Sequence, residues 1–537
     1  MTATLPVEVS RTAAQTLQES PSPQQHEGTG KAAADAVGDD SIALSSLGSS
    51  RPDSRVDLLP PSITPTSSSE HLVSDLEPID SGPGAYKFLA AAALFEFVIW
   101  GQSYAYGAYE AYHSHNPKSP LYGKASQPAL SAIGTLVIAG QHFVPLLSRG
   151  FFRSYPHWIK RTAFASIALS SACLLIASFL DSYVPALLVF QGILYGTLSG
   201  VTFTPVILWL PQWFDKRMGF ASGIIYSGSG AGGTLFPIAI NHALESVGFA
   251  WTLRLSAAWG LILAGGAAFF LKPRLPITRP NTRPRSMIRA LAPEGLGSLL
   301  HPFAVTQVVL VVCQASAWCT ISLYLATWTS SLGFSATTST GVLSGFNAAA
   351  TIGYLVTGRL IDSMPYLVLM SGSTLICGLS AYLLLGFSHS LPLIIIFSLI
   401  FGAAGGGFTT FFTPVSRSIA SLFSQEVSPL YLAVIFIRGI AAVAGPLIGS
   451  ALYDPTVSDY SLYGTKGFQG LVLFVGSGMA LASVTGVIVI AQQKRLVKSG
   501  PAKSGGGGAR EQVSAAASTT SGAGGSARRR SGEAENA

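Results

Sequence analysis

Twelve apolar stretches, each about 20 to 28 residues long, lie between Tyr86 and Ala491 with only short polar breaks between them. An α-helix of that length spans a bilayer core of about 30 Å and satisfies its own backbone hydrogen bonds there. Twelve such spans predict an all-α polytopic membrane protein and leave little sequence for an enzyme domain. The chain is therefore expected to move a solute across a membrane, and no enzymatic activity is expected.

The chain divides into two sets of six predicted spans, two polar tails and a central linker. Residues 1–83 and 494–537 are polar or rich in small residues, which predicts disordered tails. Residues 84–271 and 302–493 are expected to form two six-helix bundles, separated by a basic linker at 272–301. The predicted spans are residues 86–111, 127–147, 161–180, 184–210, 218–241, 249–271, 303–328, 337–358, 364–386, 391–415, 428–452 and 467–491.

Composition argues against several other classes of protein. Only 11% of the residues are charged, against about 25% in an ordinary soluble domain. The net charge of +7 does not indicate nucleic-acid binding, because Lys and Arg flank the spans and form no stripe interleaved with aromatic residues. The four cysteines lie inside apolar spans without CxxC spacing, so neither a disulfide nor a metal site is expected. No GxxxxGK[ST] sequence is present, and no ATP or other cofactor is expected.

The distribution of Lys and Arg beside the spans predicts the orientation in the membrane. Most of them lie on one set of loops, in the tails and in the linker, whereas the opposite loops carry only Lys118, Lys124 and Lys466. Because basic loops stay in the cytosol, both termini and the linker are expected there. The plasma membrane is the favoured location, and a vacuolar or other membrane is the alternative. The sequence does not indicate an oligomeric state.

A faint internal repeat relates the two sets of spans. The sequence Phe-Thr-Pro-Val occurs at residues 203–206 and again at 412–415, and Pro237 and Pro446 keep the same offset. Together with the span count, this repeat predicts two homologous six-helix bundles in a parallel arrangement, as in many secondary transporters.

The segment at residues 213–223, WFDKRMGFASG, carries the most specific motif of the chain. Gly219 and Gly223, and further along Gly228 and Gly232, form small-xxx-small pairs that let helices approach closely. The segment resembles the signature of the monocarboxylate transporter-like family, in its fungal branch, within the major facilitator superfamily. Weaker similarities to that branch are found at Trp100-Gly101, at residues 106–112, at Tyr155-Pro156 and at residues 445–449. The resemblance implies the major facilitator fold and proton-coupled symport of a small organic metabolite.

The sequence departs from this family at positions that its members use. The Asp-Gly-Gly run before the first span appears only as Asp80-Ser81-Gly82-Pro83-Gly84. Members that carry lactate or pyruvate use a lysine within the first span, which is absent here, and Tyr354 stands where a fungal-type arginine is expected. Fungal relatives also carry riboflavin and other metabolites, so the resemblance does not fix the substrate.

Two ionisable residues are expected near the middle of the membrane. Glu96 follows Lys87 by nine residues and Arg438 follows Pro429 by nine, which places each about 13 Å from the cytosolic surface. A charged group at that depth usually pairs, titrates or faces a wet cavity. We expect Arg438 to attract an anionic or polar substrate and Glu96 to carry the coupling proton. The alternative is a static pair, or a glutamate kept protonated by a neighbour.

Polar and aromatic side chains on four spans are expected to line the same cavity. In the superfamily that the chain resembles, spans one, four, seven and ten line the substrate path. Amides and indoles there could bind an organic substrate, although hydrogen bonds between helices are an equally good account of any single residue. The candidates are Trp100, Gln191, Gln307, Gln314 and Trp318, with Asn347 from span eight.

A second group of charged residues is expected to form a gate. Arg359 and Asp362, at the cytosolic end of the span 337–358, resemble the gating motif of the superfamily, whose charges hold the bundles together. Asp215, Lys216 and Arg217 are assigned to the same gate. The corresponding turn at residues 148–150 lacks the acid, so that copy of the motif is degenerate. The alternative for Arg359 is a simple positive-inside anchor.

The favoured function is thus a proton-coupled secondary transporter that works by alternating access on a small organic molecule. Its partners would be that substrate, protons and the lipid bilayer. An uncoupled facilitator or a metabolite exporter is the near alternative. A nutrient sensor that signals through its long tails without transporting is the alternative from another class.

Overall fold

The computed structural model describes residues 76–277, 296–454 and 462–499, and within these ranges it contains helices and no strands. An all-helical membrane protein is thereby confirmed. Most of each predicted disordered tail lies outside the described ranges, as does most of the predicted 272–301 linker. Residues 494–499, which were predicted to be disordered, are helical. The predicted boundary of the second bundle at residue 493 lies inside a helix that continues to Ser499.

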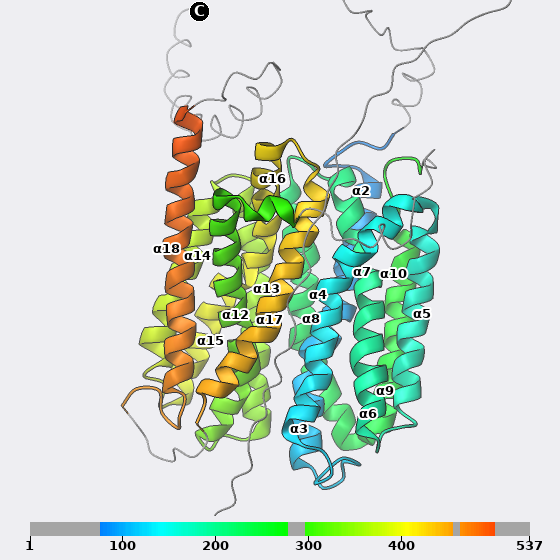
Figure 1. Ribbon diagram of the computed structural model, residues 1–537. Helices are drawn as coiled ribbons and strands as arrows, with labels where there is room; N and C mark the ends of the chain where they lie inside the picture. Colours follow the sequence, from blue (N-terminus) through cyan, green and yellow to red (C-terminus); the bar gives the residue numbers. More distant parts are fainter. Residues whose placement is uncertain (1–75, 278–295, 455–461, 500–537) are drawn as a thin grey trace, which may run out of the picture. The chain divides into compact units, whose positions relative to one another are not determined.

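The first half of the chain forms one group of helices (Figure 1). Short 3-10 and π-helical turns, labelled η, interrupt several of its spans. Its elements are α2 (Pro83–Tyr104), α3 (Tyr106–His115), α4 (Gln127–Ser154), η1 (Pro156–Trp158), α5 (Ile159–Ala177), α6 (Val184–Leu187), η2 (Leu188–Leu194), α7 (Tyr195–Trp213), α8 (Met218–Ser246), α9 (Gly248–Trp259), η3 (Gly260–Ala264) and α10 (Gly265–Phe270).

The second half forms the other group, which is coloured green to orange in Figure 1. Its elements are η4 (Gly297–Leu300), α12 (Pro302–Ser331), α13 (Ala336–Ile361), α14 (Tyr366–Ser380), η5 (Ala381–Leu385), α15 (Leu391–Gly406), η6 (Gly407–Phe411), α16 (Phe412–Phe423), α17 (Val427–Leu452) and α18 (Gln469–Ser499).

Ten helical segments of the described ranges are long and apolar enough to cross a membrane. The two predicted spans that are missing from this set, 218–241 and 337–358, coincide with the long helices α8 and α13. Both helices are rich in Gly, Ser and Thr, which lowers their hydropathy. Because they pack against each other between the two groups of helices, much of their surface meets protein, and a polar composition is tolerated there.

Helix starts follow local sequence signals. Proline occupies the first turn of α2, α4, α12 and α15, where its missing N–H has no helical partner to lose. Ser335 precedes α13, and its side-chain oxygen accepts a hydrogen bond from the backbone N–H of Thr338. The positions at which these helices begin are therefore encoded in the local sequence.

Glycines on two faces of α8 set its position. A Cβ atom added to Gly228 would lie 2.1 Å from the carbonyl oxygen of Ala93 in α2. One added to Gly223 would lie 2.7 Å from the carbonyl oxygen of Tyr354 in α13. The predicted small-residue faces are confirmed, and they allow α8 to touch α2 in its own bundle and α13 in the other bundle.

The two bundles meet along two helix pairs, α8 with α13 and α4 with α17. We call the end of the bundles at which α2 begins and α18 ends the basic end, since Lys216, Arg217, Arg359 and Arg417 lie there. In Figure 1 the basic end is at the top, and α3, α6 and α9 approach the opposite end.

Candidate functional site

Glu96 is a buried carboxyl group on α2, with 1% of its surface exposed. Its Oε1 atom has no hydrogen-bond partner. The side chain lies against α8, where a Cβ added to Gly228 would come within 3.1 Å of the Glu96 Cβ. A carboxyl oxygen that is buried without a partner is costly, so Glu96 is either neutral or bound to something that the protein itself does not supply.

Arg438 is the buried cation of the opposite bundle, on α17. Its Nη1 atom donates to Gln314 Oε1 over 3.3 Å, and its guanidinium carbon lies 5.4 Å from the centre of the Phe412 ring. Among the described residues no ion pair joins Arg438 to a carboxylate, so it does not pair with Glu96. An arginine held by an amide and a ring keeps donors for an anion.

Four tyrosines surround these two charges. Glu96 and Arg438 both lie within electrostatic range of Tyr104, Tyr354 and Tyr431. The hydroxyl group of Tyr431, on α17, is hydrogen-bonded to that of Tyr226 on α8, which joins the two bundles. The predicted pair of ionisable residues therefore belongs to one polar cluster at the bundle interface.

The other predicted site residues divide into two groups. Asn347 donates from Nδ2 to the Gly233 carbonyl across the bundle interface over 3.1 Å, and Gln314 holds Arg438. By contrast, Trp318 stacks on Phe346 and Phe401 inside its own bundle.

Two amides also lie away from the cluster. Gln307 accepts a hydrogen bond from the Tyr366 hydroxyl within the second bundle, near the basic end. Gln191 is buried in the π-helical turn η2, which packs on α4 and α5 of the first bundle.

His142, on α4, was not among the residues selected from the sequence. Its ring lies 4.9 Å from the ring of Trp100, edge to face, and its Nδ1 lies 2.9 Å from the Ile138 carbonyl oxygen. Its Cβ atom packs on Gly439, the residue after Arg438, where an added Cβ would come within 2.4 Å. The sequence signal that could have identified His142 is a single histidine inside an apolar span.

Two contacts at the basic end join α8 and its preceding loop to the second bundle. The Asp362 carboxylate accepts hydrogen bonds from the backbone N–H groups of Gly219 and Phe220, each over 2.8 Å. Asp215 forms an ion pair with Arg417 over 3.0 Å. Burial raises the pKa of Asp362, and these two hydrogen bonds only partly oppose it. Both predicted acids of the gate thus lie in contacts between the bundles.

The three predicted basic residues of the gate are exposed, and two of them take part through their backbone. Asp80 accepts hydrogen bonds from the N–H groups of Asp215, Lys216 and Arg217 over 2.9 to 3.0 Å. Partial burial alone would raise the pKa of Asp80, but these hydrogen bonds outweigh it and lower the pKa. The Arg359 charge acts on Asp362. Asp80 has a φ of 61°, which was not foreseen from the sequence.

Arg149, in the turn at residues 148–150, forms an ion pair with an acidic residue of the other bundle. Arg149 donates from Nη2 to Glu426 over 2.9 Å, and Glu426 is the residue that precedes α17. The turn has no acid of its own, as expected, and Arg149 forms its ion pair with an acid of the other bundle instead.

No group of three or more His, Cys, Asp or Glu side chains in the described ranges is arranged to hold a metal ion. The four cysteines are free, and two of them, Cys173 and Cys377, are buried.

Comparison with known proteins places this arrangement in a wider context. The sequence model of the Major Facilitator Superfamily matches residues 88–446. The chain is 26% identical over 411 residues to the MFS-type transporter pynF of Aspergillus niger, which covers 75% of this chain and 89% of the relative. It is 25% identical over 382 residues to the aspyridones efflux protein apdF of Emericella nidulans, which covers 70% of this chain and 73% of the relative.

A solved structure shows the same fold. The crystal structure of the human organic anion transporter MFSD10 (TETRAN) aligns with a TM-score of 0.57 at 14% sequence identity. The alignment covers 76% of this chain and 100% of that chain. At this level of identity the likeness concerns the fold alone.

Proposed function

Because this chain belongs to the major facilitator superfamily, we propose that it is a proton-coupled secondary transporter of a small organic acid or a related metabolite. Transport would proceed by alternating access, with the two bundles rocking about the cluster at their interface. The membrane location and the spanning helices agree with such a role.

The observation that carries the proposal is the pair of unmatched charges at the bundle interface. Among the described residues, Arg438 has no carboxylate and Glu96 has no basic side chain as an ion-pair partner, although both are buried in the same cluster. Ionisable residues inside membrane proteins most often mark substrate or proton pathways. We assign the substrate anion to Arg438 and Gln314, and the coupling proton to Glu96.

The contacts between the bundles at the basic end are assigned to one step of the transport cycle, the opening to the cytosol. If the Lys and Arg distribution sets the orientation, the basic end faces the cytosol. The contacts of Asp362, Asp215 and Arg149 then hold the bundles together on the cytosolic side. Their rupture would accompany opening of the cluster to the cytosol.

The substrate class rests on one resemblance and one structural observation. The WFDKRMGFASG segment resembles the monocarboxylate transporter-like family, and the unpaired Arg438 suits a carboxylate. Export is the second candidate, because one relative is named as an efflux protein for aspyridones. An exporter could use the same two charges, with the proton and the organic anion moving in opposite directions.

Uptake in transporter-deficient yeast tests the proposal. The full chain is expressed in the plasma membrane, and lactate, pyruvate, riboflavin and related acids are offered at pH 5 and pH 7.5. A proton symporter gives uptake that is stronger at pH 5 and is abolished by a protonophore. Reduced cellular accumulation of a panel member, again sensitive to the protonophore, indicates export. No response to any panel member, with the protein at the cell surface, argues against an organic acid of this kind.

Two substitutions with matched controls assign the roles. Arg438→Gln should abolish transport, and Arg254→Gln, which changes a cation that contacts Ser178 and two rings within the first bundle, should retain it. Glu96→Gln should remove the response to pH, and Glu245→Gln, on an exposed turn near the end of α8, should keep it. Normal transport with an unchanged pH response in both site variants would exclude the assigned roles.

A further inference from the structure

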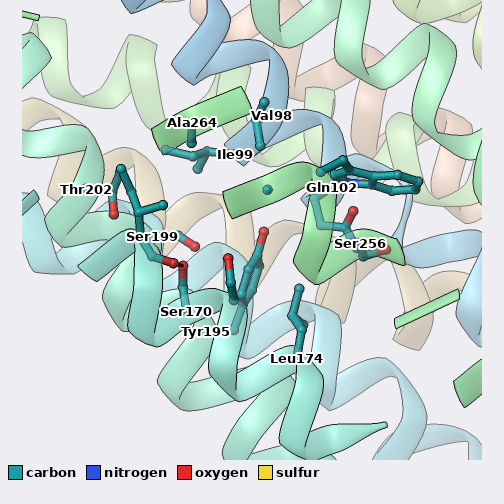
Figure 2. Close-up of a pocket in the computed structure, with 14 residues that line it drawn as sticks. Val98, Ile99, Gln102, Ser170, Leu174, Tyr195, Ser199, Thr202, Ser256 and Ala264 are labelled. Carbon is teal, nitrogen blue, oxygen red and sulfur yellow. Dashed lines mark hydrogen bonds between the residues drawn. The ribbon is translucent and has the colours of Figure 1, made fainter. Parts of the chain in front are cut away.

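A cavity of about 20 Å³, lined by both polar and apolar side chains, lies inside the first bundle, and neither Glu96 nor Arg438 lines it. Figure 2 shows Ser170, Ser199 and Thr202 on one side of it, Gln102 and Ser256 on the other, and Tyr195 between them. These residues come from α2, α5, α7 and α9, so four helices of the bundle share the cavity.

Two of the hydroxyl groups around the cavity use their protons elsewhere. Ser170 and Thr202 each donate to a main-chain carbonyl of the preceding turn, over 2.9 Å. Gln102 donates from Nε2 to the hydroxyl of Tyr109 over 3.2 Å. A hydroxyl has one proton and two lone pairs, so Ser170 and Thr202 offer the cavity lone pairs and no further proton. At these two residues the cavity can accept hydrogen bonds from a ligand.

One acceptor at the cavity is left without a partner. Gln102 is 5% exposed, and its Oε1 atom makes no hydrogen bond. Almost all buried polar atoms in proteins are hydrogen-bonded, either to protein or to ordered water. The Gln102 amide is already fixed by Tyr109, which in turn contacts Ser256 over 2.9 Å. With Nε2 on Tyr109, the Oε1 atom of Gln102 is left for a partner from outside the protein.

The backbone beside the cavity is also irregular. The π-helical turn η2 leads directly into Tyr195, and the π-helical turn η3 supplies Gly260 and Ala264 to the cavity wall. Single π-helical turns inside α-helices are frequently found at functional sites. Here two of them frame the same small space.

We propose that this cavity binds one ordered water molecule, which donates a hydrogen bond to Gln102 Oε1 and links α2 to the hydroxyl groups of α5 and α7. A volume of 20 Å³ exceeds the roughly 10–15 Å³ that one water requires, and several polar partners are present. Water is a better ligand than a metal cation, because the wall contains no carboxylate.

The bound water has a structural consequence. The helix α2 also carries Glu96 and Trp100, so a hydrogen-bonded link from Gln102 to neighbouring helices fixes the rotation of the helix that presents these side chains. Gln102 is then a positioning residue. This inference concerns the interior of one bundle, and it stands independently of the substrate and of proton coupling.

Density in a high-resolution experimental structure of the full chain in lipid is the direct test. A peak about 3 Å from Gln102 Oε1 is expected. An empty cavity overturns the proposal. A sodium ion would overturn it as well, and it would show as a melting temperature that rises in sodium chloride relative to choline chloride.

Hydroxyl-radical labelling provides a second readout in solution, because radiolysis of a bound water modifies the side chains beside it. Tyr195 should be labelled in the wild type, and its labelling should fall several-fold in Gln102→Leu. Ile99→Val, which enlarges the same cavity and keeps the amide, should retain the labelling. Equal labelling in wild type and Gln102→Leu would contradict the proposal. The wild-type density decides the question if Gln102→Leu does not fold.

Discussion

The two helix pairs that join the bundles occupy related positions in the internal repeat but use different chemistry at the basic end. In the α8–α13 pair, Asp362 binds two backbone N–H groups, and glycines bring the helices into contact. In the α4–α17 pair, Arg149 binds the side chain of Glu426. The Arg149 side chain is 5% exposed and that of Glu426 is 67% exposed.

This difference has consequences for strength. A carboxylate on the N-terminus of a helix meets donors that cannot move away, and it also interacts favourably with the helix dipole. An ion pair with one exposed partner is weakened by water and by salt. The α8–α13 contact should therefore be the stronger one, and the α4–α17 contact should be the one that salt and single substitutions loosen. The two helix pairs thus make related contacts at the basic end with different chemical groups.

The largest effect is expected at the glycines of α8. In Gly223→Val the new side chain would collide with the backbone of Tyr354 and Gly358, so the helices must separate. We expect a loss of about 2–3 kcal/mol of stability and a clear drop in melting temperature of the purified protein. Gly345→Val on α13, which meets open space, is the control. Equal melting temperatures for the two variants would show that the close contact is unimportant.

Asp362→Ala should have the next largest effect. It removes a charged acceptor from two backbone N–H groups, which costs about 1.5–3 kcal/mol for hydrogen bonds of this kind. Spin labels on either side of the basic end should report a shift of the population towards the open form. A distance distribution identical to that of the wild type would refute the assignment of Asp362 to the gate.

Asp80→Ala should loosen the start of α8 by about 1 kcal/mol, as the loss of a helix cap does. Because the pKa of Asp80 is lowered, its contribution is present above the ordinary carboxyl range and is lost only when the pH falls through the lowered value. The difference in melting temperature between variant and wild type should thus be the same at pH 5 and pH 7.5. A difference that disappears at pH 5 would be inconsistent with an ionised Asp80.

The smallest effect is expected for the pair of Arg149 and Glu426. A double-mutant cycle of Arg149→Ala and Glu426→Ala should give a coupling energy below about 1 kcal/mol, because Glu426 is exposed. The coupling should shrink further at high salt. A salt-independent coupling as large as the effect of Asp362→Ala would remove the contrast between the two contacts.

The sequence predicted the fold well, because span length, helix starts and small-residue faces are local properties. The α8 glycines and Asp215 were recognised from the WFDKRMGFASG segment, and Asp362 was recognised from the separate gating motif after the span 337–358. The partner of Arg149 was missed because Glu426 is 277 residues away, and nothing in the local pattern joins them. Asp80 was noted only as a departure from a family motif, since its role depends on a loop conformation with positive φ.

The candidate site could be predicted only in part. The depth of a residue in the membrane follows from its distance along the helix, so the positions of Glu96 and Arg438 near the middle of the membrane could be predicted. Helix rotation does not follow from counting, and it decides which neighbour a side chain meets. Trp318 packs on two phenylalanines of its own bundle, and Gln307 accepts a hydrogen bond from Tyr366 of the same bundle. The monocarboxylate-like substrate and proton coupling stay predictions.

Proton movement in liposomes tests the central claim most directly. The purified full chain is reconstituted with a pH-sensitive dye inside, and the substrate identified in yeast is added outside without a pH gradient. Our account predicts a substrate-dependent change of internal pH in the wild type and in Glu245→Gln, and none in Glu96→Gln, which should still exchange labelled substrate. A Glu96→Gln protein that moves protons with substrate as the wild type does would contradict the account.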